Sequence, residues 1–119
     1  MDRRIEVVIS RMEDQLSNSW QVGELALLVN LSASRLRHLF KTETGKTPAQ
    51  YLKDLRLRRA EFLLRTTFLS VKEIVNRVGL ITASHFVREF KKAYGVAPIT
   101  YRHSVRATPS RDRWASSSR

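Results

Sequence analysis

Two segments of this sequence place serine, histidine and arginine side chains at corresponding positions. The first segment contains Ser34, Arg35, Arg37 and His38, and the second contains Ser84, His85, Val87 and Arg88. An arginine side chain can donate two hydrogen bonds to a guanine, a serine can donate or accept one, and a valine methyl group can pack on the methyl group of thymine. Presented together from one helix, side chains of these types are suited to reading base edges in the major groove of duplex DNA.

Both segments belong to an internal repeat. Six residues recur at an offset of fifty positions: Ser34, Phe40, Lys41, Gly45, Pro48 and Tyr51 return as Ser84, Phe90, Lys91, Gly95, Pro98 and Tyr101. Upstream the offset is 49, because Glu24-Leu25 matches Glu73-Ile74 and Val29 matches Val78. A repeat composed of a short apolar helix, a turn and a second helix predicts a duplicated helix-turn-helix.

The elements that must position these side chains are all helical, so the predicted fold class is all-α. Apolar periodicity and capping residues predict seven helices, at about 2–17, 22–29, 33–43, 48–65, 71–78, 83–93 and from 98 onward. The long helix at 48–65 joins two helix-turn-helix units, 22–44 and 71–94, within one domain of residues 1–105. Residues 106–119 show no periodicity and are expected to form a flexible basic tail.

The apolar pattern decides which side of each helix is available to a ligand. The first helix is expected to bury a stripe of Ile5, Ile9, Met12 and Leu16 with Val8 beside it, and the helix at 22–29 is expected to be mostly buried. The inward residues of the two groove-facing helices are predicted to be Leu36, Leu39, Phe40, Phe86 and Phe90. The polar residues of both segments are therefore left on the exposed side.

Hydroxyl and left-handed residues mark the predicted helix ends. An N-cap is predicted at Ser32, Thr47, Ser70 and Thr82, and Gln50 and Glu73 complete two capping boxes. Asn30 and Gly79 are predicted to end helices in the left-handed conformation, at equivalent positions of the two repeats.

A further set of residues is suited to phosphate contact, which sets affinity more than sequence preference. The cations expected to be exposed near the ends of the groove-facing helices are Lys41, Lys91, Lys92 and Arg102. Helix N-termini capped by Ser32, Ser70 and Thr82 can also offer backbone N–H groups to phosphate oxygens. The competing interpretation is that the arginines are solvated surface charges and that Ser34 and Ser84 only cap their helices. Recurrence at matching helix turns favours DNA contact for the arginines.

Composition narrows the class of protein. The 119-residue chain has 22 Lys and Arg against 11 Asp and Glu, a formal net charge of +11 that favours a polyanionic partner. The absence of cysteine from the sequence excludes disulfides, thiol nucleophiles and thiolate metal sites. The histidines lack metal-site spacing, and no Gly-rich phosphate loop or catalytic triad is evident, so we expect neither a cofactor nor an enzyme. With no apolar run of membrane-spanning length, we expect a cytoplasmic, nucleoid-associated protein without membrane contact.

The second repeat closely resembles the signature of the AraC/XylS family of bacterial transcription regulators. The resemblance rests on residues 74–80, 84–92 and 95–102. The first repeat is similar through Leu25-Ala26, Ser34, Leu36, Phe40-Lys41, Gly45, Pro48, Tyr51-Leu52, Arg56-Leu57 and Ala60. The likeness covers about residues 5–105.

This resemblance implies a domain that inserts its third and sixth helices into successive major-groove segments of double-stranded DNA. Mapped by motif position, the implied base-reading residues are Ser34, Arg35, Arg37, His38, Ser84, His85 and Arg88. RNA polymerase is the implied protein partner of an activator of this type. The sequence departs from the family pattern at His38, usually arginine, at Asn30, commonly glycine, and at Ile81, commonly polar.

Many family members carry a separate effector-binding or dimerisation domain, for which this chain has no room. Two organisations therefore stay open, a small stand-alone member and an excised DNA-binding domain. In either case, the chain is expected to bind as a monomer.

Other functions stay open as well. A non-specific architectural DNA-binding protein would discriminate little between sites. An adaptor or membrane-surface module would use basic helices such as 48–65, although the apolar residues of that helix are expected to face the interior. A DNA-repair regulator with a cysteine methyl acceptor is excluded for this chain, because the sequence contains no cysteine.

Overall fold

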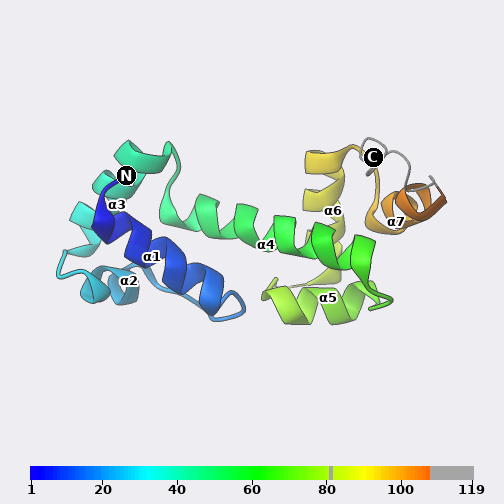
Figure 1. The fold of residues 1–119 in the computed structure, drawn as a ribbon, viewed down its shortest axis with the longest axis horizontal. Coiled ribbons are helices and arrows are strands. Elements are labelled where there is room, and N and C mark those ends of the chain that lie inside the picture. Colours follow the sequence, from blue (N-terminus) through cyan, green and yellow to red (C-terminus); the bar gives the residue numbers. More distant parts are fainter. Residues whose placement is uncertain (81, 108–119) are drawn as a thin grey trace, which may run out of the picture.

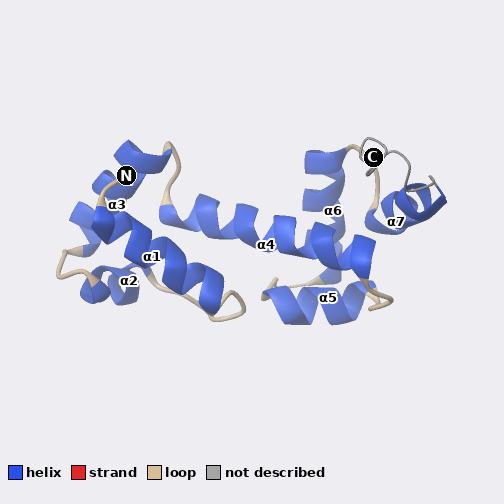
Figure 2. Cartoon of the chain, viewed as in Figure 1, coloured by secondary structure: helices blue, strands red, loops and turns tan. Residues whose placement is uncertain are grey.

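The computed structural model describes residues 1–80 and 82–107, in which every regular element is a helix (Figures 1 and 2). The helices are α1 (Arg3–Asp14), α2 (Val22–Leu28), α3 (Ala33–Thr44), α4 (Pro48–Thr66), α5 (Val71–Val78), α6 (Ala83–Tyr94) and α7 (Pro98–Ala107). The all-α prediction with seven helices is confirmed. The molecule is elongated, 48 × 33 × 22 Å, and α4 runs along its length between a unit of α1–α3 and a unit of α5–α7.

The predicted helix starts form as the sequence indicates. The Ser32 hydroxyl accepts a hydrogen bond from the Arg35 amide at 3.1 Å, and the Thr82 hydroxyl accepts one from the His85 amide at 3.1 Å. Capping boxes are present at Thr47 with Gln50 and at Ser70 with Glu73. A further box, Gln21 with Glu24, opens α2 and was not predicted, because glutamine is an uncommon N-cap.

Each unit has its own hydrophobic core, and α4 contributes to both. The first core contains Ile5, Val8, Met12, Leu25, Ala26, Leu36, Phe40 and Leu52. The second contains Leu57, Ala60, Leu64, Ile74, Val75, Val78, Phe86 and Phe90. The buried residues of α1 (Ile5, Val8 and Met12) have the same spacing as the residues that α4 contributes to the second core (Leu57, Ala60 and Leu64). The C-terminal half of α4 takes the place of α1 in the second unit, so the repeat is larger than the predicted helix-turn-helix.

Burial differs from expectation in three places. Val8 is at the centre of the α1 stripe, while Ile9 and Leu16 are only partly buried. The expectation that the second helix is mostly buried is wrong, because only Leu25 and Ala26 are buried in α2 and Leu27 is 77% exposed. With seven residues, α2 buries just one side against the core. Leu39 is likewise partly buried, at the edge of the core.

The C-terminal boundary also differs. Helix α7 extends to Ala107, whereas a flexible tail was expected from residue 106. Two main-chain carbonyls of other elements accept hydrogen bonds from Arg106, which explains why the helix continues. Ile81 and the remainder of the predicted tail, 108–119, lie outside the described residues.

Candidate nucleic-acid interface

The first turns of α3 present the predicted reading residues to solvent. Ser34, Arg35, Arg37 and His38 are all exposed, while Leu36 and Phe40 on the opposite side of the helix are fully buried. A shallow groove of about 490 Å³ runs along the outer side of α3, and its lining includes Ser34, Arg37, His38 and Lys41. The fold therefore gathers these side chains on one surface.

Helix α6 repeats the arrangement of α3, but two of its polar-side residues are less exposed. Ser84 and Arg88 are exposed, His85 and Val87 are partly buried, and Phe86 and Phe90 are fully buried. The Glu89 carboxylate forms an ion pair with the Lys53 ammonium group of α4 at 2.6 Å, and this contact lowers the pKa of Glu89. The pair ties α6 to α4 beside the predicted reading residues. In Figure 1, α3 and α6 both extend to the upper edge of the molecule, α3 near the N-terminal end of α4 and α6 over its C-terminal half.

Most of the residues predicted to contact phosphate are placed where a duplex could reach them. Lys41, Lys91 and Lys92 are exposed in the last turns of α3 and α6. The caps Ser32, Ser70 and Thr82 are exposed, and each hydroxyl oxygen already accepts a hydrogen bond from a first-turn amide of its helix. Their hydroxyl protons can still be donated to a phosphate oxygen.

The expectation that Arg102 is exposed, on which its predicted phosphate contact rests, is wrong. Its residue exposure is 9%, and its guanidinium donates to the carbonyl oxygens of Leu64 at 3.0 Å and Thr67 at 3.2 Å. Burial lowers the pKa of Arg102, and the positive charge of Arg106 lowers it further. Both arginines serve the carbonyl groups at the C-terminal end of α4, which lack helical partners.

Arg56 has a structural role of the same kind, which the sequence reading missed. Its Nε donates to the Leu16 carbonyl at 2.9 Å and its Nη2 donates to the Asn18 carbonyl at 2.5 Å, in the loop that follows α1. The signal was available in the repeat, because Arg56 and Arg106 are fifty residues apart. Both lie in the helix that packs behind the reading helix, and both donate to the loop after the first helix of their unit.

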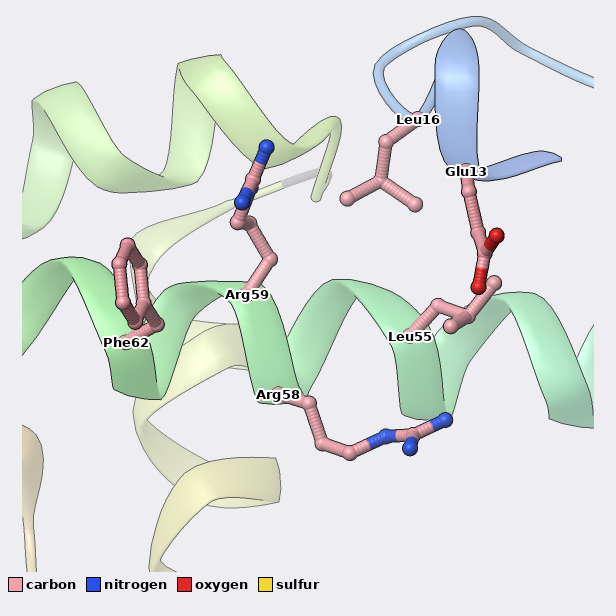
Figure 3. Close-up of a pocket in the computed structure, with 6 residues that line it drawn as sticks. All are labelled: Glu13, Leu16, Leu55, Arg58, Arg59 and Phe62. Atoms are coloured by element: carbon pink, nitrogen blue, oxygen red, sulfur yellow. The ribbon is translucent and has the colours of Figure 1, made fainter. Parts of the chain in front are cut away.

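No group of three or more His, Asp or Glu among residues 1–80 and 82–107 is placed to hold a metal ion. Over the same residues, no helix combines the length and apolar character needed to cross a bilayer. The groove in Figure 3, about 340 Å³ along α4, is open and is lined by the charged side chains Glu13, Arg58 and Arg59 together with the apolar Leu16, Leu55 and Phe62.

Comparisons with known proteins agree with this geometry. A family model described as a helix-turn-helix domain matches residues 25–104. The arabinose operon regulatory protein of Escherichia coli (strain K12) is 33% identical over 103 residues, which are 86% of this chain and 35% of that protein. The chain spans about a third of the length of the curated relatives it matches.

Solved structures give the same result. The DNA-binding domain of AdpA, a global transcriptional factor crystallised with a target DNA, is 28% identical with a TM-score of 0.82, covering 87% of this chain and 94% of that one. An AraC-type regulator from Chromobacterium violaceum is 29% identical with a TM-score of 0.82, covering 90% and 95% of the two chains. The fold and the matched family define a helix-turn-helix protein, and this chain belongs to the AraC/XylS family of transcription regulators.

Proposed function

We propose that this chain is a sequence-specific DNA-binding module of a transcription regulator, which reads duplex DNA with α3 and α6. The observation that carries the proposal is that both helices have a buried apolar side and an exposed polar side at equivalent positions. Each buries two large apolar residues, Leu36 and Phe40 or Phe86 and Phe90, and leaves polar reading side chains exposed in its first turns. In a helix-turn-helix it is this part of the second helix that meets base edges.

Different residues have different roles in the proposed complex. The exposed arginines Arg35, Arg37 and Arg88 are suited to guanine, while the serines and histidines are suited to adaptable polar contacts. Lys41, Lys91 and Lys92 would engage phosphates at the ends of the two reading helices. Relatives named as regulators, and a neighbour crystallised with its target DNA, support a DNA-binding role for the chain.

Selection from a random duplex library, followed by footprinting, tests the proposal. The expected result is one enriched sequence protected over about two helical turns, with two base-specific patches about 10 base pairs apart. An architectural protein would instead bind selected and random duplexes with equal affinity. That outcome would contradict sequence-specific reading.

The salt dependence of binding tests the phosphate contacts. If about six phosphates are engaged, the slope of log affinity against log salt should be about −5, from about −0.9 per contact on duplex DNA. A slope shallower than about −2 would show that this basic surface does not lie along the backbone.

We further propose that the module binds DNA as a monomer in the bacterial cytoplasm and contacts RNA polymerase as an activator. Two relatives named as transcriptional activators support the activator role. The expected result is a one-to-one complex in analytical ultracentrifugation and increased transcription from a template carrying the selected site. A two-to-one complex would contradict the monomer.

A further inference from the structure

The second unit and α4 form one packed body. Leu57, Ala60 and Leu64 of α4 are part of the second core, and Arg102 donates to the carbonyl oxygens at the end of α4. The first core receives from α4 only Leu52 among its buried members. Tyr51 and Leu55 of α4 pack against that core but are only partly buried, so contacts outside α4 also contribute to the orientation of the first unit.

One such contact joins the main chains of the two units directly. A Cβ atom built on Gly79 would lie 2.7 Å from the Cα atom and 3.0 Å from the carbonyl oxygen of Ser17. Ser17 belongs to the loop between α1 and α2, and Gly79 belongs to the turn between α5 and α6. The turn of the second helix-turn-helix therefore rests on a loop of the first unit, with no space for a side chain.

The internal repeat shows that the backbone conformation alone does not require glycine at this position. Asn30 occupies the equivalent position of the first unit with a positive φ of 58°, and Gly79 has φ 83°. Asparagine tolerates the left-handed region well enough to end a helix. In the second unit a Cβ atom at φ 83° would, besides the strain of the left-handed backbone, collide with the main chain of Ser17.

The loop that carries Ser17 is held on both sides. Arg56 donates to the carbonyl oxygens of Leu16 and Asn18, which flank Ser17. The Trp20 indole donates to the Gln15 carbonyl at 3.1 Å, and Trp20 packs against the first core. The surface that Gly79 meets is therefore a fixed part of the first unit.

Little else fills the space between the units at this point. A groove of about 510 Å³ separates residues 13–17 of the first unit from Arg77 and Val78 of the second. The neighbouring groove in Figure 3 lies between Leu16 and α4, with Arg59 and Phe62 along the helix. The Ser17–Gly79 contact is thus bordered by open grooves.

We propose that the contact of Gly79 with the Ser17 loop, braced by Arg56, sets the relative orientation of α3 and α6 and so determines which spacing of two DNA segments the protein accepts. This positioning role rests on the proposed function for its DNA consequence. Its structural consequence, the angle between the units, can be measured without DNA.

Distances between spin labels test the structural part. The sequence contains no cysteine, so Ser34→Cys with Ser84→Cys places labels at equivalent exposed sites of α3 and α6. Gly79→Ala should broaden or shift the distance distribution measured by pulsed electron paramagnetic resonance. Gly95→Ala is the matched control, because Gly95 has φ 85° and nothing within 4 Å of a built Cβ atom. Equal distributions in both variants would overturn the proposal.

Binding to a series of duplexes tests the DNA part, using chains without labels. The selected site is varied by inserting or deleting one or two base pairs between its two patches, and a half-site with only the second patch is included. Gly79→Ala should reduce the preference for the selected spacing at least tenfold and leave half-site affinity unchanged, while Gly95→Ala keeps the preference. Retained spacing preference in Gly79→Ala would overturn the proposal, whereas a wild-type protein that prefers no sequence would overturn the proposed function instead.

A second variant covers the case in which Gly79→Ala does not fold, as judged by circular dichroism. Arg56→Gln removes the brace from the Ser17 loop, and Arg58→Gln, an exposed neighbour, removes the same charge without that contact. Arg56→Gln should broaden the distribution of distances between the labels and weaken the preference for the selected spacing. If it behaves as Arg58→Gln does, the loop does not position the units.

Discussion

Leu52 and Arg102 lie at equivalent positions of the two units, fifty residues apart, but they have different structural roles. Leu52 is buried in the first core, whereas the Arg102 guanidinium donates to main-chain carbonyls at the end of α4. The difference follows from the chain that surrounds each position. Carbonyl groups in the loop after α1 receive hydrogen bonds from Trp20 and Arg56, whereas those at the end of α4 receive theirs from Arg102 and Arg106.

The aromatic content of the two cores differs as well. Among the described residues, Phe40 has one ring neighbour, Tyr51, at a centroid distance of 5.3 Å. Its counterpart Phe90 contacts Phe86, Tyr94 and Tyr101 at 5.6, 4.4 and 5.2 Å. The two units therefore share backbone and packing positions but not the interactions that fill them. A sequence repeat conserves where side chains are buried more closely than what they contact.

Truncation of the central phenylalanines should produce the largest effect. Phe90→Ala is expected to cost about 3–5 kcal/mol of stability, and Phe40→Ala somewhat less, because each aromatic pair adds about 0.5–1.5 kcal/mol beyond burial. Urea unfolding followed by circular dichroism measures both. A larger loss of stability for Phe40→Ala than for Phe90→Ala would contradict the expectation that the additional ring contacts stabilise the second core.

Removal of a reading arginine should affect one half of the DNA site. Arg88→Ala is expected to relax base preference at a single position in the second patch by about 1–3 kcal/mol. Lys91→Ala should weaken binding to all sequences alike, because a phosphate contact carries no base information. Titrations against single-base variants of the selected site measure both. Direct readout by Arg88 is wrong if its replacement also acts uniformly.

Replacement of Arg102 by leucine, the residue type at the equivalent position 52 of the first unit, tests whether the carbonyl groups at the end of α4 depend on this donor. Arg102→Leu should lower stability by about 1–3 kcal/mol, because buried carbonyl oxygens lose a donor. The salt dependence of DNA binding should not change, since Arg102 is buried, whereas Lys91→Gln should make it shallower with little change in stability. A shallower salt slope for Arg102→Leu would restore Arg102 as a phosphate ligand.

The smallest expected effect concerns alkaline pH. Burial, with a hydrogen bond donated by its hydroxyl to Glu61, raises the pKa of Tyr101 to about 12 from an ordinary value of 10.0. The folded state holds this proton more tightly than the unfolded state, so the contribution to stability is present below pH 10 and is lost between pH 10 and 12. Tyr101→Phe should reduce the loss of stability across that window in thermal melts. Tyr51→Phe, the first-unit control, should leave the loss as in the wild type.

Much of the architecture could be predicted from local patterns. The helix starts at Ser32, Thr47, Ser70 and Thr82 depend on hydroxyl groups acting within one turn, so sequence neighbours are sufficient to place them. The exposure of the α3 reading residues followed from helical periodicity around Leu36 and Phe40. Whether those residues contact DNA stays a prediction.

Long-range partners were the part that could not be predicted. The pattern placed Arg102 on an exposed surface, because periodicity does not show that an unpaired helix end lies opposite it. The same limit hid the role of Arg56 and the ion pair between Lys53 and Glu89. The predicted burial of α2 failed for Leu27 because an apolar residue in a short helix is buried only if another element covers it.

The amino-acid sequence by itself determined the helices, their ends and the repeated division into apolar and polar sides, since all of these depend on interactions within a few residues. The tertiary structure alone decided how the two units face each other. That arrangement depends on main-chain atoms of Ser17 and Gly79 meeting across 62 positions of sequence, and on carbonyl groups whose donors come from distant helices. Contacts of this kind involve backbone atoms that every residue carries, so residue type gives little sign of them.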